Sequence, residues 1–295
     1  MRADAVAAGC EPEAVRRLAA QLDARGHPYG AVEDALETAG LPASADVLVY
    51  VDAATLYRQP AVARALFGVL RQAGVAFTVL KETQSSGKAL AMLGCLRQAA
   101  AAARATAGRI RAAGCRTVVC PSPSAFDAFA NDYASLGAPL EGVSVQHSST
   151  FLAGLFESGA LKPARPGRPV AYLDSDYLKN YNALAEAPRA LLRRAGCEVA
   201  DFGTNREESY SLGEGAEVLD LLYPGIVKAM LGRVLDLARR DGCPALAVSS
   251  PYTLHVLRQA GEPGLRVDSV EELVAECVLI QPGNPAGARR GGRVE

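Results

Sequence analysis

The fold is decided by two stretches of the sequence that repeat one pattern. They are IRAAGCRTVVCPSPSAF (110–126) and ARRDGCPALAVSSPYTL (238–254). Each stretch reads as the end of a helix, a glycine, a β-branched strand and a proline-containing turn that begins another helix. A pattern that returns at a fixed offset indicates two copies of one structural unit, so the chain is predicted to be internally duplicated.

The repeat extends in both directions from these stretches, at an offset of roughly 122 to 130 residues. The further matching pairs are VLVYVDAATL (47–56) with VAYLDSDYL (170–178), FGVLRQAGVAFTVL (67–80) with RALLRRAGCEVADF (189–202), TQSSG (83–87) with SYSLG (209–213), and LEGVSVQHSSTFLAGL (140–155) with GLRVDSVEELVAECV (264–278). Strands that alternate with helices favour a parallel sheet covered on both faces. We therefore predict an α/β fold of two Rossmann-like repeats with parallel sheets, related by a pseudo-twofold axis, plus a short N-terminal helical segment.

Four segments follow from this pattern. Residues 1–45 form the N-terminal helical segment, which is too short to build a core alone. Residues 46–166 and 167–280 form the first and second repeats, joined by a Pro- and Gly-rich link at 159–169. Residues 281–295, rich in Gly and Arg, are expected to be a disordered tail. Within each repeat, the segment before the third strand is predicted to be one long helix.

Composition excludes several classes of protein. The net charge of −1 gives no general attraction to nucleic acid or to an anionic membrane. No apolar run approaches the roughly 20 residues that span a bilayer, and the start of the chain lacks the apolar core of a secretory signal. We therefore expect a cytoplasmic protein. Seven cysteines are present without a CxxC pair, so no disulfide framework is expected.

Sites in doubly wound sheets form beyond the carboxyl ends of the strands. Three loops of each repeat are expected to meet there. Their polar or small residues are Asp52, Gln84 to Gly87 and Cys120 to Pro123 in the first repeat, and Asp174 to Asp176, Ser211 to Gly213 and Ser250 to Thr253 in the second.

The order of these turns resembles the cysteine-rich CCG domain family, whose members include the heterodisulfide reductase B subunit and the glycolate oxidase iron–sulfur subunit. The resemblance covers about residues 25–278. It rests on His27-Pro-Tyr-Gly30, Val145-Gln-His147, Val170 to Asp176, and Ala187-Pro188-Arg189. The resemblance implies a cysteine after the first strand, a Cys-Cys-Gly turn and a Cys-Pro-x-Cys turn in each repeat, which in many members ligate a [4Fe–4S] cluster.

Nearly all of those ligand positions differ in this chain. They fall on Asp52, Ser85, Ser86, Cys120 and Pro123 in the first repeat, and on Asp176, Ser211, Leu212, Ser250 and Thr253 in the second. Clusters are normally held by four thiolates, and one cysteine of ten remains. We therefore expect no cofactor, no catalytic residue and no metal ligand at these vestigial positions.

Two further polar residues are candidates for the cleft. His147 and Asp174, together with Asp52 and Asp176, could bind a hard cation or act as acid and base. Asp52 and Asp176 are equivalent positions of the two repeats, so they are expected to lie in different sites and not to share one metal. The more conservative interpretation is that Asp174 and Asp176 brace their turn. The segment Ser85-Ser86-Gly87-Lys88 lacks the upstream glycine of a phosphate-binding loop.

The resemblance implies a cluster-deficient subunit of a heterodisulfide reductase-like or glycolate or lactate oxidase-like electron-transfer complex, with mainly a structural or docking role. Whether the chain belongs to an enzyme is left open; if it does, we expect a non-catalytic or electron-transfer subunit of an oxidoreductase. The expected partner is a flavoprotein or an iron–sulfur subunit, through which the chain could associate peripherally with a membrane. The alternatives are an enzyme that binds a small anion in the vacated cleft, and a simple binding module.

Overall fold

Two parallel sheets form the framework of the protein, which we describe from a computed structural model. The structure describes the chain except residues 30–35, 37, 39, 81–84, 204–205 and 280–295. The first sheet contains β1 (Val47–Val49), β2 (Phe77–Val79), β3 (Thr117–Cys120) and β4 (Ser144–His147), in the order β2-β1-β3-β4. The second contains β5 (Val170–Leu173), β6 (Val199–Ala200), β7 (Ala245–Val248) and β8 (Arg266–Ser269), in the order β6-β5-β7-β8.

Every strand pairing in the two sheets is parallel. The prediction of an α/β protein with parallel sheets is confirmed. The structure adds β4 and β8, which the sequence pattern did not separate from the helices that follow them. Both sheets place their strands in the same order, with the first strand of each set in the interior and its successor at the edge.

Helices connect the strands. They are α1 (Arg2–Ala7), α2 (Glu13–Arg25), α3 (Pro60–Gln72), α4 (Lys88–Leu93), α5 (Leu96–Ala112), α6 (Pro123–Asp127), α7 (Ser148–Glu157), α8 (Glu186–Arg194), α9 (Leu219–Leu222), α10 (Pro224–Arg240), α11 (Pro251–Ala260) and α12 (Val270–Val278). Short π-helical turns lie at η1 (Ala54–Arg58), η2 (Ala128–Asp132) and η3 (Tyr177–Tyr181), and 3-10 turns lie at η4 (Arg206–Glu208) and η5 (Gly215–Glu217). None of the helices described here is long and apolar enough to cross a membrane.

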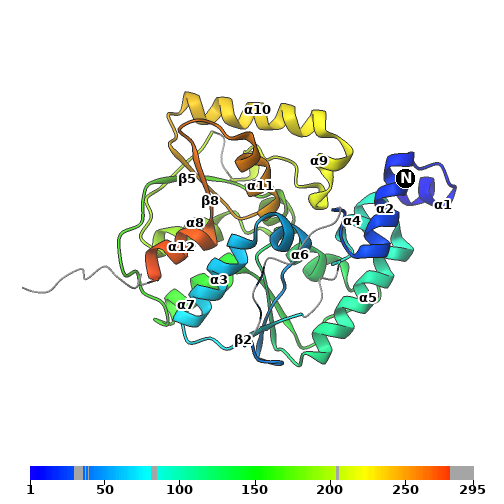
Figure 1. The fold of residues 1–295 in the computed structure, drawn as a ribbon, viewed down its shortest axis with the longest axis horizontal. Helices are drawn as coiled ribbons and strands as arrows, with labels where there is room; N and C mark the ends of the chain where they lie inside the picture. Colours follow the sequence, from blue (N-terminus) through cyan, green and yellow to red (C-terminus); the bar gives the residue numbers. More distant parts are fainter. Residues whose placement is uncertain (30–35, 37, 39, 81–84, 204–205, 280–295) are drawn as a thin grey trace, which may run out of the picture.

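The largest apolar core lies between the two sheets. Helices α3 and α7 from the first half pack against α12 and α8 from the second, and Figure 1 shows these four helices close together. Their buried residues include Leu66, Leu152, Leu191 and Val274, each almost completely buried. Side chains of β1 and β5 belong to the same cluster, so one core is shared by both halves of the chain.

The predicted long helix of each half is broken. In the first half, Gly94 separates α4 from α5 and adopts a left-handed backbone with φ of 90°. A Cβ at this position would lie 2.7 Å from the carbonyl carbon of Arg2, so the break lets α1 approach the backbone closely. In the second half, the short α9 precedes α10, which begins at Pro224.

The N-terminal segment packs on the first half of the molecule. Apolar residues of α2 such as Leu18 and Leu22 contact a small core formed by α4 and α5, which also contains Ala216 and Val218 from the second half. Residues 30–35, 37 and 39 of the predicted N-terminal segment and the whole predicted tail at 281–295 lie outside the described part of the chain.

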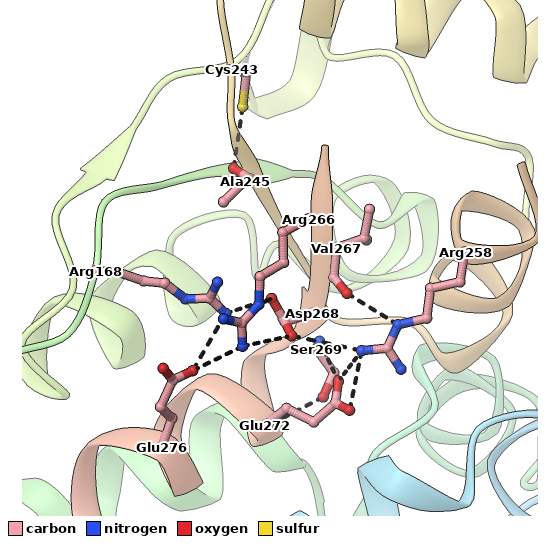
Figure 2. Close-up of polar contacts among 10 residues, drawn as sticks. All are labelled: Arg168, Cys243, Ala245, Arg258, Arg266, Val267, Asp268, Ser269, Glu272 and Glu276. Atoms are coloured by element: carbon pink, nitrogen blue, oxygen red, sulfur yellow. Dashed lines mark hydrogen bonds and ion pairs between the residues drawn. The ribbon is translucent and has the colours of Figure 1, made fainter. Parts of the chain in front are cut away.

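Ion pairs stabilise the junction of β8 and α12, which Figure 2 shows in detail. Asp268 accepts hydrogen bonds from Arg168 and from Arg266, the latter at 2.9 Å. Glu272 forms a capping box with Ser269 at the start of α12. Arg258 donates to the Glu272 carboxylate and also, at 2.9 Å, to Oε1 of Gln59 at the start of α3, so the network ties the second half to the first.

Candidate functional site

Loops from the carboxyl ends of β1, β2 and β3 meet one residue of the second half, Glu217, in what we call the first loop cluster: Asp52, Ser85, Ser86, Ser122 and Glu217. Asp52, Ser85, Ser86 and Glu217 line one cavity. The local sequence explains the loop positions. Asp52 Oδ1 accepts a hydrogen bond from the Thr55 N–H at 2.9 Å and so caps η1, while the Ser122 hydroxyl accepts from the Ala125 N–H and caps α6.

A glycine turn fixes the two serines. The Ser85 hydroxyl accepts a hydrogen bond from the Gly87 N–H at 3.1 Å. Gly87 has φ of 82°, and a Cβ there would lie 2.9 Å from the carbonyl oxygen of Ala99. Only glycine satisfies both the left-handed backbone and this close approach, so the turn holds Ser85 and Ser86 at the cavity.

The corresponding loops of the second half form the second loop cluster: Ser175, Asp176, Ser211, Glu214 and Ser250. The Ser175 hydroxyl donates to Oε2 of Glu214 at 2.9 Å, and the Ser211 hydroxyl donates to the Asp176 carboxylate. Ser250 caps α11 by accepting from the Thr253 N–H, and its side chain also interacts with the Glu214 carboxyl.

One short segment, Gly213 to Glu217, supplies a glutamate to each cluster. Glu214 lies in the second cluster, whereas Glu217 crosses to the first, where its Oε1 accepts a hydrogen bond from the Ser122 hydroxyl at 2.6 Å. Ala216 and Glu217 have φ of 55° and 68°, a left-handed backbone that costs about 1–2 kcal/mol per non-glycine residue. The Tyr177 hydroxyl accepts from the Ala216 N–H at 3.0 Å and helps to hold this conformation.

Glu214 is buried and Glu217 is half-buried, and their removal from water changes their acidity. Burial and, to a smaller extent, the neighbouring charge of Asp176 raise the pKa of Glu214 to about 7. Burial and the carboxylate of Asp52 raise the pKa of Glu217 well above its ordinary value. The two clusters consist of acidic and hydroxyl side chains, which do not attract an anion, so they do not favour the small-anion site considered from the sequence.

The other residues predicted at cluster positions are Cys120, Pro123, Leu212 and Thr253, which lie in apolar cores or in the first turns of helices. Cys120 is fully buried in an apolar core with Tyr50 and Phe126, and burial raises the pKa of its thiol well above the ordinary value. Leu212 is fully buried in the core of the second half. Pro123 begins α6, and Thr253 lies buried in the first turn of α11.

The two other candidates from the sequence are engaged in separate contacts. Asp174 forms a bidentate ion pair with Arg189, at 2.6 and 2.8 Å, inside the protein. His147 is completely buried, its Nδ1 lies 2.8 Å from the Ser149 hydroxyl, and burial lowers its pKa to about 4. Neither residue lines the cavity of the first loop cluster.

These residues do not fit an iron–sulfur cluster held by four thiolates. Cys120 is the single cysteine at the ten ligand positions of the CCG pattern, and its thiol lies in an apolar core and stays protonated. In the part of the chain that the structure describes, no group of three or more His, Cys, Asp or Glu side chains could hold a metal ion.

The sequence did not single out Glu214, Glu217 or Tyr29 as site residues. A signal for the glutamates was present, because Gly213-Glu-Gly-Ala-Glu217 follows directly on the Ser211-Leu212-Gly213 turn. This segment has two glycines and two glutamates next to a loop that was predicted to lie at the site. Such a composition indicates an irregular backbone that brings acidic side chains into the site.

No protein-family model matches the chain. Among curated proteins, it is 32% identical over 255 residues to a "Probable membrane-anchored ferredoxin" of Chromohalobacter salexigens, covering 82% of this chain and 38% of that protein. It is 26% identical over 224 residues to the "Probable iron-sulfur-binding oxidoreductase FadF" of Bacillus subtilis, covering 72% of this chain and 30% of that protein. It is 29% identical over 116 residues to the "EtfAB:quinone oxidoreductase" of Syntrophomonas wolfei, covering 39% of this chain and 16% of that protein.

Solved structures resemble the chain more distantly. A putative Asp/Glu racemase from Yersinia pestis shares 13% identity at a TM-score of 0.37, covering 78% of this chain and 96% of the racemase. The chain spans less than two-fifths of the length of each of the three curated relatives.

The relatives correct one expectation from the sequence. We expected no cofactor, yet two of the three relatives are named as a ferredoxin and as an iron–sulfur-binding oxidoreductase, which contradicts that expectation. The loss of cysteines from the loops was therefore not a sufficient reason to exclude an iron–sulfur cofactor. The curated relatives of this chain are iron–sulfur oxidoreductase-like proteins.

Proposed function

We propose that this chain is the α/β module of an iron–sulfur electron-transfer assembly of the CCG type, in which it holds and docks the redox components. The observation that carries this proposal is the 32% identity to a protein named as a ferredoxin across 82% of the chain. The common strand order of the two sheets supports a duplicated scaffold with boundaries near residues 46, 167 and 280. We expect the partner to be a flavoprotein or an iron–sulfur subunit.

The finer part of the proposal concerns the thiolates. Within the two loop clusters, carboxyl and hydroxyl groups occupy most of the positions that carry cysteines in the CCG pattern. Cys120 remains, but its protonated thiol is packed among apolar side chains. We therefore propose that the cofactor of the assembly takes its thiolates from cysteines outside these loops.

Affinity purification of the tagged chain under anaerobic conditions from its source cells tests the assembly. We expect a redox partner to copurify and to be identified by mass spectrometry. Iron, acid-labile sulfide and charge-transfer absorbance are expected in the same fraction. Recovery of the chain without any flavin- or iron-containing partner would count against the assembly.

The variant Cys120→Ser tests the location of the ligands. We expect the ratio of iron to protein in the purified assembly to stay unchanged, because the thiol is not a ligand. Cys115→Ser is the matched control, since Cys115 is also buried in the same core cluster. A loss of iron in Cys120→Ser but not in Cys115→Ser would show that the loop thiol does bind the cofactor.

A further inference from the structure

The cavity of the first loop cluster has a volume of about 40 Å³. Its polar lining includes Tyr29, Asp52, Ser85, Ser86 and Glu217. A single water needs roughly 10–15 Å³ measured in this way, so the cavity has room for an ion with a few waters.

Two buried polar atoms in this lining lack a hydrogen-bond partner among the described residues. They are the Tyr29 hydroxyl and Oδ2 of Asp52, on residues that are 8% and 6% exposed. Buried polar groups in proteins are nearly always paired. Because Tyr29 comes from the N-terminal segment and Asp52 from the loop after β1, two independent parts of the chain each contribute a residue with an unpaired oxygen to the lining of the same cavity.

The charges of the side chains that line the cavity indicate which kind of ligand it can bind. Asp52 and Glu217 bring two carboxyl groups within interaction distance, and the contact between them has no donor unless one keeps a proton. Lys88 is the basic side chain of the lining, but Asp127 and Asp132 neutralise it at 2.5 and 2.6 Å. The polar side chains directed at the ligand thus carry oxygen atoms and a net negative charge.

We propose that this cavity binds one hard divalent cation, of the Mg²⁺ or Ca²⁺ kind, between the carboxylates of Asp52 and Glu217. The hydroxyls of Tyr29, Ser85 and Ser86 and water molecules complete its shell. Magnesium commonly binds through one or two carboxylates and keeps several waters. A site with only two carboxylates is therefore sufficient, although the described residues contain no group of three acidic, His or Cys side chains that could hold a metal ion. An oxygen-only site of this kind selects hard cations and not thiophilic metals.

Terbium luminescence tests this proposal on the full chain. The chain has 10 tyrosines and no tryptophan, and Tyr29 and Tyr50 line the cavity, so excitation of tyrosine will sensitise a Tb³⁺ ion bound there. We expect luminescence that saturates at one equivalent and is displaced by Ca²⁺ or Mg²⁺, whose relative potency distinguishes the two. Unsaturable luminescence, or failure of both cations to displace Tb³⁺, would overturn the proposal.

Variants locate the site. Asp52→Asn and Glu217→Gln keep the shape of each side chain, and each is expected to weaken Tb³⁺ binding at least about tenfold, since even indirect partners of a metal contribute 10–100-fold. Asp236→Asn, at an exposed acid on α10, is the control for surface binding. Unchanged affinity in both cavity variants would refute the location. If either variant fails to fold, Tyr29→Phe decides instead, because removal of the Tyr29 hydroxyl is expected to weaken binding, whereas an unchanged affinity would count against the site.

Discussion

Glu271 is a fully buried carboxyl group in α12 that meets the other half of the molecule. The Ser148 hydroxyl of α7 donates a hydrogen bond to its Oε1, while Oε2 has no partner among the described residues. Burial raises the pKa of Glu271 from 4.5 to about 7. Between these two pH values the native state binds a proton that the unfolded chain has lost, so the free energy of unfolding falls as pH rises through this window.

The variant Glu271→Gln should remove this pH dependence. A pKa shift of this size lowers the free energy of unfolding of the wild type by at most about 3 kcal/mol above pH 7. We therefore expect the variant to be more stable than the wild type by about 1–3 kcal/mol at pH 8, and to differ little near pH 4.5. Urea unfolding at several pH values measures the difference. The pKa of His147 is lowered, so below its ordinary value the contribution of His147 makes the free energy of unfolding rise with pH. This contribution cancels in the comparison, because both proteins contain His147.

Glu141→Gln provides the control for this measurement, because Glu141 lies exposed in the turn before β4. Its difference from the wild type should stay within about 0.5 kcal/mol at every pH. If the free energy of unfolding of Glu271→Gln also stayed within about 0.5 kcal/mol of the wild type at every pH, the Glu271 carboxyl would have to be ionised in the native state. That outcome would contradict its complete burial.

At the scale of elements, the break between α4 and α5 depends on one glycine. Gly94→Ala would place a methyl group against the backbone of Arg2 and force a left-handed conformation on alanine. We expect a loss of at least about 1–2 kcal/mol in the free energy of unfolding. Displacement of α1 should appear as faster proteolytic cleavage within residues 1–12.

Gly108→Ala is the matched control on α5, since nothing lies within 4 Å of a Cβ at that position. Alanine favours a helix interior by about 1 kcal/mol over glycine, so this variant should be neutral or more stable. Equal effects of the two substitutions would mean that the α4–α5 break does not need the left-handed glycine. Thermal unfolding of both variants decides between these outcomes.

The elements show which parts of the fold a sequence pattern can predict. Strands β1, β3, β5 and β7 and the glycines that follow α3 and α8 were predictable, because buried β-branched runs and left-handed glycines are local signals. The α4–α5 break was not, since Gly94 lies in a run of strong helix formers and its conformation depends on the contact with α1. Strand β4 was missed because its first residues are partly or fully exposed and it leads directly into α7.

The same distinction applies to the candidate site. The sequence predicted the loops at the strand ends, which follow from topology, and Asp52, Ser85 and Ser86 do line a common cavity. It did not predict the glutamates, because Ala216 and Glu217 adopt a backbone that sequence patterns reserve for glycine. Asp174 looked like a loop residue of the cleft, but its partner Arg189 is a buried arginine that an apolar pattern does not reveal.

For the whole molecule, the shared core implies that the two halves unfold together. Leu66 of α3 is fully buried in a cluster that also contains residues of β5, β7 and α12. We expect Leu66→Ala to cost about 2–5 kcal/mol. Native-state hydrogen exchange should show the same loss of protection in β5 and β7 as in β1 and β3.

Leu96→Ala, at an exposed leucine that begins α5, should change these protection factors little. If Leu66→Ala reduced the protection of β1 and β3 but left the protection of β7 unchanged, the halves would unfold independently. In that case the segments predicted at 46–166 and 167–280 would be separate cooperative units.

The segment Gly213 to Glu217 has a consequence for regulation. Glu214 and Glu217 are three residues apart, so their Cα atoms lie within about 11 Å of each other, although their side chains belong to different loop clusters. The charge of Glu214 contributes to the raised pKa of Glu217. Thermodynamic linkage is reciprocal, so if protonation of Glu214 changes the proton affinity of Glu217 by some factor, protonation of Glu217 changes that of Glu214 by the same factor. The five-residue segment therefore couples the charge of the loop cluster in one half of the protein to the charge of the cluster in the other half. This coupling needs no movement of the sheets.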